Sequence, residues 1–257
     1  MKIYSWNVYC FNRQMPALAE RIRTLDFDIL CLQEVTPALL EELKKMPYYL
    51  AYHVDVLRVF SAKRKEYNYV AILSRTPYRQ TGTIPFMELP FPAHTRLFIA
   101  CMSFFHWSFI TERGALYADF EANGKQFRVF SVHLTLWGPD NRQKEFDEVA
   151  ARIDPAMTTI VCGDFNVIEY APMKVLNWIL GAPLPTALPW YPERDLFEER
   201  FARAGLHNAL RGKITHPFSK SQLDHILVSA DAKVEESKVE PERYGSDHAL
   251  VGITLGV

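Results

Sequence analysis

Histidine, carboxylate and amide side chains recur in five short motif groups that span almost the whole chain. They are SWN at 5–7, LQEV at 32–35, SVHL at 131–134, GDFNV at 163–167, and the pair QLDH at 222–225 with GSDH at 245–248. Each lies at or just beyond the end of an apolar, strand-like run, where side chains from distant parts of a chain can converge. Together they offer ligands for a hard divalent cation and donors for an anionic ester.

Each motif taken alone also has a structural explanation, because a polar residue after a strand is commonly a turn former or a helix cap. Glu34 is then a carboxylate favoured by the helix dipole ahead of Pro37. Asp164 with Asn166 forms an Asx turn, and His133 is a satisfied core histidine. The joint occurrence of all the motifs in one chain favours chemistry over these explanations.

The first elements that must position the motifs follow from hydrophobic periodicity. Apolar alternation over 3–8 precedes helical spacing from Pro16, and an apolar run at 29–32 precedes helical spacing from Pro37. The chain therefore opens with strand, helix, strand and helix.

The middle of the chain, 49–133, changes to short β-type runs, and no helix is predicted within it. A proline-rich stiff loop is predicted later, at 183–192. The other expected elements are a helix over 141–153 and strands at 69–73, 97–102, 116–120, 127–134, 159–162, 223–228 and 249–255.

Composition predicts one compact domain over residues 1–257. Hydrophobic residues make up 49% and charged residues 23% of the sequence, the balance of an ordinary globular protein. The formal net charge of −1 gives no whole-protein attraction to polyanions, so such binding needs a local patch. No sequence feature indicates an obligate protein partner.

The cytoplasm is the expected location. The N-terminus lacks the features of a secretion signal, and the most apolar run, 97–110, falls short of the roughly 20 residues that span a bilayer. We therefore predict no transmembrane segment. The four cysteines lack metal-type spacing and are expected to be buried free thiols in a reducing compartment: Cys10, Cys31, Cys101 and Cys162.

In order and wording, the motifs resemble those of the endonuclease/exonuclease/phosphatase, or DNase I-like, superfamily. The resemblance covers almost the whole chain. It implies an α+β fold, a four-layer αββα sandwich with two mostly antiparallel sheets packed face to face and helices outside. It also implies a metal-dependent hydrolase of phosphodiester bonds, with water attacking in line with the leaving group.

Within this resemblance, Glu34 is the first predicted ligand of Mg²⁺, and family analogy places Asn7 beside it. Mn²⁺ is a possible substitute for Mg²⁺. Alternation puts Asp164 and Asn166 on one side of their strand while Phe165 points into the core. Asp164 is expected to orient or deprotonate the attacking water, and Asn166 to donate to a phosphate oxygen.

The resemblance also implies that His248 contacts the phosphoryl oxygen or transfers a proton, and we expect Asp247 to fix its tautomer. Asp224 matches a position that completes the carboxylate cluster, with a strand-end carboxylate as the alternative. His225 alternates to the other face and is expected to be structural. His133 is expected in the site and separates the chain from abasic-site endonucleases, which carry a tyrosine motif there.

Two arginines, Arg96 and Arg113, are weaker candidates for substrate contact; Arg113 alternatively pairs with Glu112 or caps a strand. The basic run 58–65 is either a solvated loop or a groove that favours a nucleic-acid substrate, DNA or RNA. The proline-rich loop favours the same substrate if Trp190 and Tyr191 stack bases, and otherwise packs on the domain.

The aromatic run 102–110 is a core strand or, alternatively, a membrane-touching segment that favours a lipid phosphodiesterase of the sphingomyelinase type. An inositol phosphate phosphatase and a catalytically silent binding domain are further alternatives. The positions of the two runs relative to Glu34 discriminate the substrates. Basic side chains of 58–65 at the mouth of the site would favour nucleic acid, and exposed aromatic side chains of 102–110 would favour lipid.

Overall fold

The computed structural model describes residues 1–61, 64–87, 92–104, 108–110 and 113–256, with the backbone alone for 57–61, 64–65, 99–100, 102–104 and 108–110. These residues form two β-sheets. The order in the first sheet is β12 (Lys233–Val239), β13 (Val251–Gly256), β1 (Lys2–Asn7), β2 (Ile29–Val35), β4 (Arg64–Ser74), β3 (Tyr49–Ser61) and β6 (Ser108–Ile110). The order in the second is β10 (Leu206–Asn208), β11 (Asp224–Ser229), β9 (Thr158–Asp164), β8 (Lys125–His133), β7 (Gly114–Ala122) and β5 (Gln80–Pro85).

Two strand pairs are parallel, β1 with β2 and β8 with β9, and the other described pairs are antiparallel. A parallel pair needs a crossover connection, and a helix lies between its strands in the chain in both cases. These helices are α1 (Met15–Thr24) and α4 (Pro139–Ala150).

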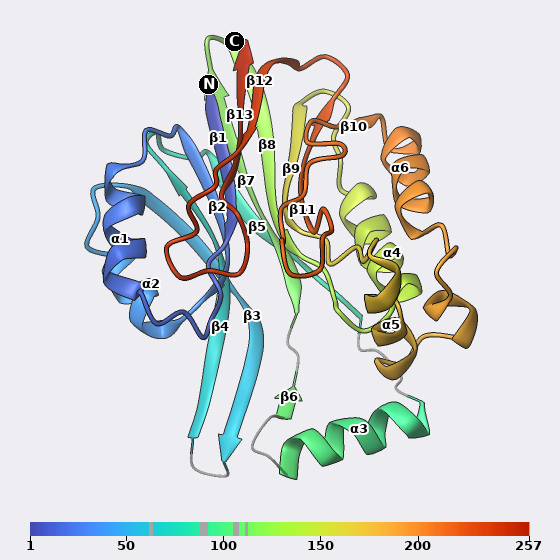
Figure 1. Cartoon of the computed structure of the whole chain (residues 1–257). Coiled ribbons are helices and arrows are strands. Elements are labelled where there is room, and N and C mark those ends of the chain that lie inside the picture. The colour runs from blue at the N-terminus through green and yellow to red at the C-terminus, as the bar shows by residue number, and fades with distance from the viewer. Residues whose placement is uncertain (62–63, 88–91, 105–107, 111–112, 257) are drawn as a thin grey trace.

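Helices cover the outer faces of both sheets (Figure 1). On the first sheet, Leu18 of α1 and Leu39 of α2 (Pro37–Leu43) pack against strand residues such as Leu30. On the second, Phe146 of α4 and Phe197 of α6 (Glu193–Arg203) pack in the same way. The predicted four-layer αββα sandwich is confirmed.

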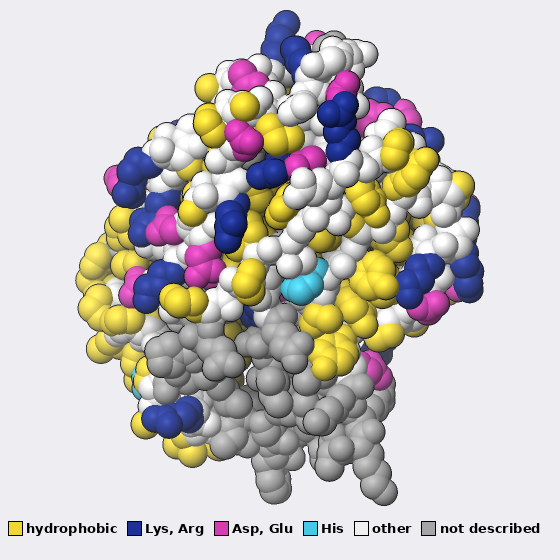
Figure 2. All heavy atoms as spheres, turned by 180° about the vertical axis from the view of Figure 1, so that it is seen from behind, with side chains coloured by type: hydrophobic (Ala, Val, Ile, Leu, Met, Phe, Trp, Pro, Cys, Tyr) yellow, Lys and Arg dark blue, Asp and Glu magenta, His cyan; other side chains and the backbone are white. Residues whose placement is uncertain are grey.

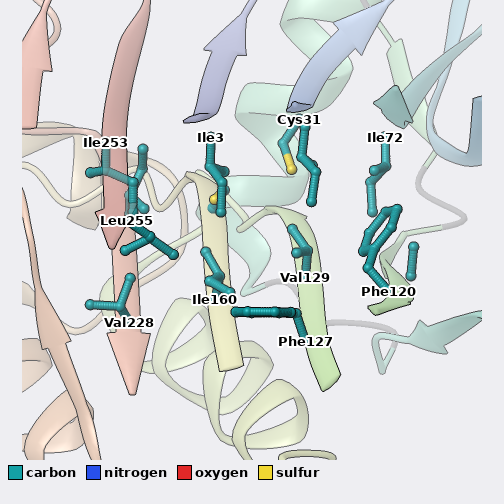
Figure 3. Close-up of a cluster of buried hydrophobic side chains, with 14 of the residues drawn as sticks. Ile3, Cys31, Ile72, Phe120, Phe127, Val129, Ile160, Val228, Ile253 and Leu255 are labelled. Atoms are coloured by element: carbon teal, nitrogen blue, oxygen red, sulfur yellow. The ribbon is translucent and has the colours of Figure 1, made fainter. Parts of the chain in front are cut away.

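The inner faces of the two sheets share one apolar core. Figure 3 shows Ile3, Cys31 and Ile72 of the first sheet opposite Val129 and Ile160 of the second. All five side chains are fully buried. Because a slip of one residue would turn an apolar set outward, this core fixes the register of each strand and hence the position of its polar end.

The predicted strand over 97–102 is wrong, as is the expectation that no helix interrupts 49–133. These residues belong to α3 (Ala93–Phe104), which lies at the end of the molecule opposite the termini, at the level of the far ends of β3 and β4 (Figure 1). The ring of His94 stacks on Trp178 of α5 (Val175–Ile179), with centroids 5.3 Å apart. A short apolar run has no periodicity that separates strand from helix, so this tertiary contact was not foreseen.

The proline-rich segment 183–192 is largely irregular, as predicted, with one short 3₁₀ turn, η2 (Leu184–Ala187). A second such turn, η1 (Ala171–Met173), precedes α5. The ammonium group of buried Lys174 donates to the carbonyl oxygens of Pro189 and Tyr191, both at 2.8 Å, and so ties the segment to the domain body.

All four cysteines are free, as predicted, but only Cys31 and Cys162 are buried. The prediction of burial is wrong for half-buried Cys10 and for Cys101, which is exposed on α3. Within the described residues, no helix has the length and apolar character needed to cross a membrane.

Candidate active site

The predicted motifs meet at one edge of the two sheets because their strands end there. Asn7 is the last residue of β1, and His133 and Asp164 are the last residues of β8 and β9. Asp224 is the first residue of β11, which runs antiparallel to β9, so it reaches the same edge. Asp164 is in register with both His133 and Asp224.

The side-chain amide of Asn7 joins carboxylates from the two sheets. Its nitrogen, Nδ2, donates to Glu34 Oε1 at 3.2 Å and to Asp164 Oδ2 at 3.0 Å. Its oxygen accepts the backbone N–H of Tyr9 at 3.1 Å. Asn7 therefore orients both carboxylates, and its amide must turn over before its oxygen can reach a cation beside Glu34.

A β-bulge in β2 aims Glu34 into the site. The register between β2 and β4 shifts between Leu32 and Val35, and Glu34 has a φ of 57°. Gln33 points between the sheets, where its amide donates to Ser131 Oγ at 3.3 Å. Bulges re-aim side chains, and a left-handed backbone at a non-glycine residue is strained, so the fold holds Glu34 in place at a cost.

Gly163 allows β9 to approach β8 closely just before Asp164. Its φ is +148°, and a Cβ atom added there would lie 1.8 Å from the carbonyl oxygen of Val132. No other residue fits this position without moving the strands. The close approach therefore places Asp164 beside His133.

His133 is held by a carboxylate that the sequence analysis did not identify. Its Nδ1 lies 2.6 Å from Oδ2 of Asp55, a fully buried residue of β3. Its Nε2 lies 3.7 Å from Asp164 Oδ2 and 4.0 Å from Glu34 Oε1. Burial lowers the pKa of His133, but Asp55, then Asp164 and Glu34, outweigh it and raise the pKa to about 9. The available signal was one aspartate within the apolar alternation of VDV at 54–56.

His248 is held in the same way by Asp224, with 2.9 Å between Nδ1 and Oδ2. The expectation that Asp247 fixes the His248 tautomer is therefore wrong, because Asp247 Oδ1 faces the opposite nitrogen, Nε2, at 4.0 Å. Sequence adjacency favoured Asp247, whereas the β11 strand end brings Asp224 closer. Burial lowers the pKa of His248, but Asp224, Asp164 and Asp247 outweigh it and raise the pKa to about 10.

Asp164 lies between the two histidines. Its Oδ2 is 3.7 Å from His248 Nε2, the same distance that separates it from His133 Nε2. Burial raises the pKa of this carboxyl, Asp224 raises it further, and the two histidines oppose the rise. Phe165 points into the core, as predicted.

Asn166 lies beyond the end of β9 with a φ of 54°, so strand alternation does not place it; its backbone N–H donates to Asp164 Oδ1 at 2.8 Å, the contact of the Asx turn considered as the structural alternative. Its side-chain amide donates to the carbonyl oxygen of Leu134 at 2.8 Å, so one of its two amide protons is engaged within the protein. A contact between Asn166 and a phosphate oxygen stays a prediction.

The two arginine candidates occupy different places. Arg113 is buried, pairs with Glu145, and donates to the carbonyl oxygen of His133, so it supports the strand end that carries His133. Arg96 is exposed on α3, and within the described part of the chain no hydrogen bond or ion pair joins it to Asn7, Glu34, His133, Asp164, Asp224 or His248. Substrate contact by either arginine stays a prediction.

Two further histidines lie near the motifs. His225 is buried beneath the site against Phe165, with ring centroids 4.6 Å apart, which agrees with its predicted structural role. His216 was missed; its ring centroid is 4.7 Å from that of His248, and its Nε2 is 3.6 Å from Asp247 Oδ2. A histidine that precedes Pro217 in a loop carries no sequence signal for this placement.

The donor set fits a hard divalent cation. Glu34, Asp164 and Asp224 supply carboxylate oxygens, and Oδ1 of Asp224 is buried without a hydrogen-bond partner among the described residues. A buried carboxylate oxygen without a partner is costly, and a bound cation or water relieves that cost. The oxygen ligands that magnesium favours are therefore present.

The side chains of the basic run 58–65 and the aromatic run 102–110 lie outside the described residues, so the expected comparison between them stays open. The backbones of 57–59 and 108–110, however, are neighbours, because β6 pairs with β3 and places Phe109 opposite Arg58. β6 is the edge strand at this end of the first sheet (Figure 1).

The fold and the site together define a class of αββα phosphoesterases. The sequence matches the model of the Endonuclease/Exonuclease/phosphatase family over residues 4–248. The chain belongs to this family, whose members are hydrolases that act on phosphoesters. No curated protein sequence gives a significant match.

Solved structures share the fold at low sequence identity. An endonuclease/exonuclease/phosphatase family protein from Leptotrichia buccalis is 18% identical, with a TM-score of 0.67 and all of both chains covered. A humanized D. rerio TDP2 is 19% identical, with a TM-score of 0.61 and coverage of 100% of this chain and 99% of that one. The mannosyl-6-phosphatase Bt3783 of Bacteroides thetaiotaomicron is 20% identical, with a TM-score of 0.58 and all of both chains covered.

Proposed function

We propose that this protein is a Mg²⁺-dependent phosphodiesterase. One observation carries the proposal: Asp164 Oδ2 lies 3.0 Å from Asn7 Nδ2 and 3.7 Å from Nε2 of both His133 and His248. A carboxylate between two cationic imidazoles provides a base for water beside donors for the phosphoryl oxygens. This combination supports hydrolysis of an anionic ester over a silent binding role.

The two histidines would bind the phosphoryl group. In each histidine an aspartate contacts Nδ1, and Nε2 lies 3.7 Å from Asp164 Oδ2. The pKa is raised to about 9 for His133 and to about 10 for His248. Both are therefore imidazolium ions near neutral pH. Their Nε2–H groups would donate to non-bridging or leaving-group oxygens, and Asp164 would orient and deprotonate the attacking water.

Glu34, with Asn7 beside it after its amide turns over, would hold the Mg²⁺ ion. Cys10 N–H donates to Glu34 Oε2 at 3.0 Å, which fixes the carboxylate in the site. When bound, the ion would supply charge neutralisation on a non-bridging oxygen. Mn²⁺ is expected to replace it.

A nucleic-acid strand is the proposed substrate class. Phe218 is 77% exposed and contacts His216, whose ring lies against His248, so an aromatic surface adjoins the phosphoryl site. A base stacked on an aromatic side chain contributes roughly 1–3 kcal/mol. The described part of the face in Figure 2 carries interspersed Lys/Arg and Asp/Glu side chains and presents no broad cationic surface.

A substrate panel tests the proposal. Single- and double-stranded DNA, RNA, sphingomyelin, inositol phosphates and a sugar phosphate would each be assayed with Mg²⁺ or Mn²⁺. We expect the highest kcat/KM on a nucleic acid and a raised KM for Phe218→Ala on that substrate alone, with Tyr49→Ala, at an exposed aromatic residue that begins β3, as the matched control. Preference for a lipid or a phosphomonoester would overturn the substrate class, and inactivity on every ester would overturn the function.

A further inference from the structure

We propose that His216, Asp247 and His248 form a second cation site that binds Zn²⁺ or a similar transition metal and thereby inhibits the enzyme. The three donor atoms are His216 Nε2, an Asp247 carboxylate oxygen and His248 Nε2, and all lie within 4.8 Å of one another. The site shares Nε2 of His248 with the phosphoryl-binding set, and its other two ligands come from Asp247 and from the loop that carries His216.

The distances suit a tetrahedral ion. His216 Nε2 is 3.6 Å from Asp247 Oδ2, and His248 Nε2 is 4.0 Å from Asp247 Oδ1. Ligands about 2.0–2.1 Å from a tetrahedral Zn²⁺ lie about 3.3 Å apart, so closure needs movements of several tenths of an ångström. The side chain of Asp247 is 39% exposed and has room to make them.

The far nitrogen of each imidazole is already held, as in metal sites where a second contact fixes the ring. His248 Nδ1 is 2.9 Å from Asp224 Oδ2, and His216 Nδ1 is 2.8 Å from Ser219 Oγ. The Ser219 hydroxyl in turn reaches the carbonyl oxygen of His216 at 3.4 Å. With the proton on Nδ1, His216 can donate to Ser219 Oγ, and Nε2 keeps its lone pair for the ion. In this tautomer Nδ1 no longer accepts the backbone N–H of Ser219, which lies 3.2 Å away.

The chemistry of the donors separates this site from the magnesium site. Imidazole nitrogen suits zinc, nickel and copper, whereas carboxylate and carbonyl oxygen suit magnesium. The ion would displace the Nε2 proton of His248 to solvent. Inhibition follows because His248 Nε2 can then no longer donate to a phosphoryl oxygen, and this consequence rests on the proposed function.

Metal binding is tested first, without any substrate. Zn²⁺ would be titrated against a chromophoric chelator in excess Mg²⁺, using the wild type, His216→Gln, and His207→Gln as a control at an exposed histidine. Loss of a ligand is expected to weaken binding by at least the roughly 10–100-fold typical of disturbed metal sites. Unchanged binding in His216→Gln, or displacement of Zn²⁺ by Mg²⁺, would overturn the site.

Co²⁺ provides a readout that needs no variant, so a folding defect in His216→Gln leaves the test intact. In the wild-type protein with excess Mg²⁺, we expect the intense visible absorption of four-coordinate Co²⁺, lost on addition of Zn²⁺. The weak spectrum of six-coordinate Co²⁺ would contradict the proposal.

Inhibition is measured separately on the best substrate of the panel. Each rate is normalised to the Mg²⁺-supported rate of the same protein, and His216→Gln should need at least about tenfold more Zn²⁺ than the wild type for half inhibition. Wild-type sensitivity in this variant would overturn the inhibitory role. Zn²⁺ binding in the chelator assay by a protein inactive on every ester would leave the site standing and refute only the proposed function.

Discussion

His133 and Asp55 join the two sheets at the site, with His133 Nδ1 of β8 2.6 Å from Asp55 Oδ2 of β3. Asp224, the first residue of β11, contacts Nδ1 of His248 in the same manner. Each imidazole thus has one nitrogen fixed by a carboxylate and the other directed to Asp164. The spacing of the two sheets therefore sets the position of one of the two phosphoryl donors.

Asp55→Asn should lower kcat while leaving the fold intact, because the imidazole loses its fixed orientation and its pKa falls. We expect a loss of about 10–100-fold, the usual effect of removing an orienting partner. Steady-state rates and the NMR titration of His133 would measure it. Asp26→Asn, at an exposed aspartate, is the control, and an unchanged rate with an unchanged His133 pKa would contradict the role.

Asp164→Ala and His248→Ala should each reduce turnover of a simple phosphodiester by at least about 10²–10⁴-fold, the contribution of a general acid or base. Asp164 is the last residue of β9 and His248 lies in the loop before β13, so urea unfolding should remain cooperative. Wild-type-like rates in either folded variant would refute the assigned roles.

Removal of divalent metal with EDTA should abolish hydrolysis, and added Mg²⁺ or Mn²⁺ should restore it. The physical reason is that carboxylates crowd the site and repel an anionic ester until a cation offsets their charge. Full activity after exhaustive chelation and dialysis would remove the proposed metal role from Glu34 and Asn7.

The stability of the metal-free protein should fall in mildly alkaline solution. The pKa of His133 rises from 6.5 to about 9 in the folded state, so the folded state binds the extra proton. That stabilisation is complete below pH 6.5 and is lost as the pH rises to about 9. Urea unfolding across this range in EDTA would measure the decline, which Asp55→Asn should reduce; an equal decline in both proteins would contradict the coupling.

Gly163→Ala should destabilise the protein more than Gly124→Ala. Both glycines have positive φ, which costs an alanine about 1–2 kcal/mol. A Cβ atom at Gly163 would also lie 1.8 Å from the carbonyl oxygen of Val132. A Cβ atom at Gly124 would have no atom of a residue beyond its chain neighbours within 4 Å, among the described residues. We expect the difference in the free energy of unfolding to exceed about 2 kcal/mol, within the range of strong single-site effects. Equal losses of stability in the two variants would contradict the close approach of β8 and β9 at Gly163.

The sequence by itself determined the site ingredients and the layers. Asn7, Glu34, His133, Asp164 and Asp224 follow apolar runs or begin them, and the shared core makes these strands end at one edge. Hydrophobic periodicity is a local property, so strands and helices with clear periods were predicted at nearly their observed positions.

Only the tertiary structure decided which partner each histidine has. Asp55 is buried in a strand far from the motifs, and Asp224 displaces the sequence neighbour Asp247 beside His248 Nδ1. Contacts across sheets depend on register and sheet spacing, which leave no mark in local patterns. Similarly, α3 was not foreseen because an apolar run fits either a strand or a helix until its neighbours are in place.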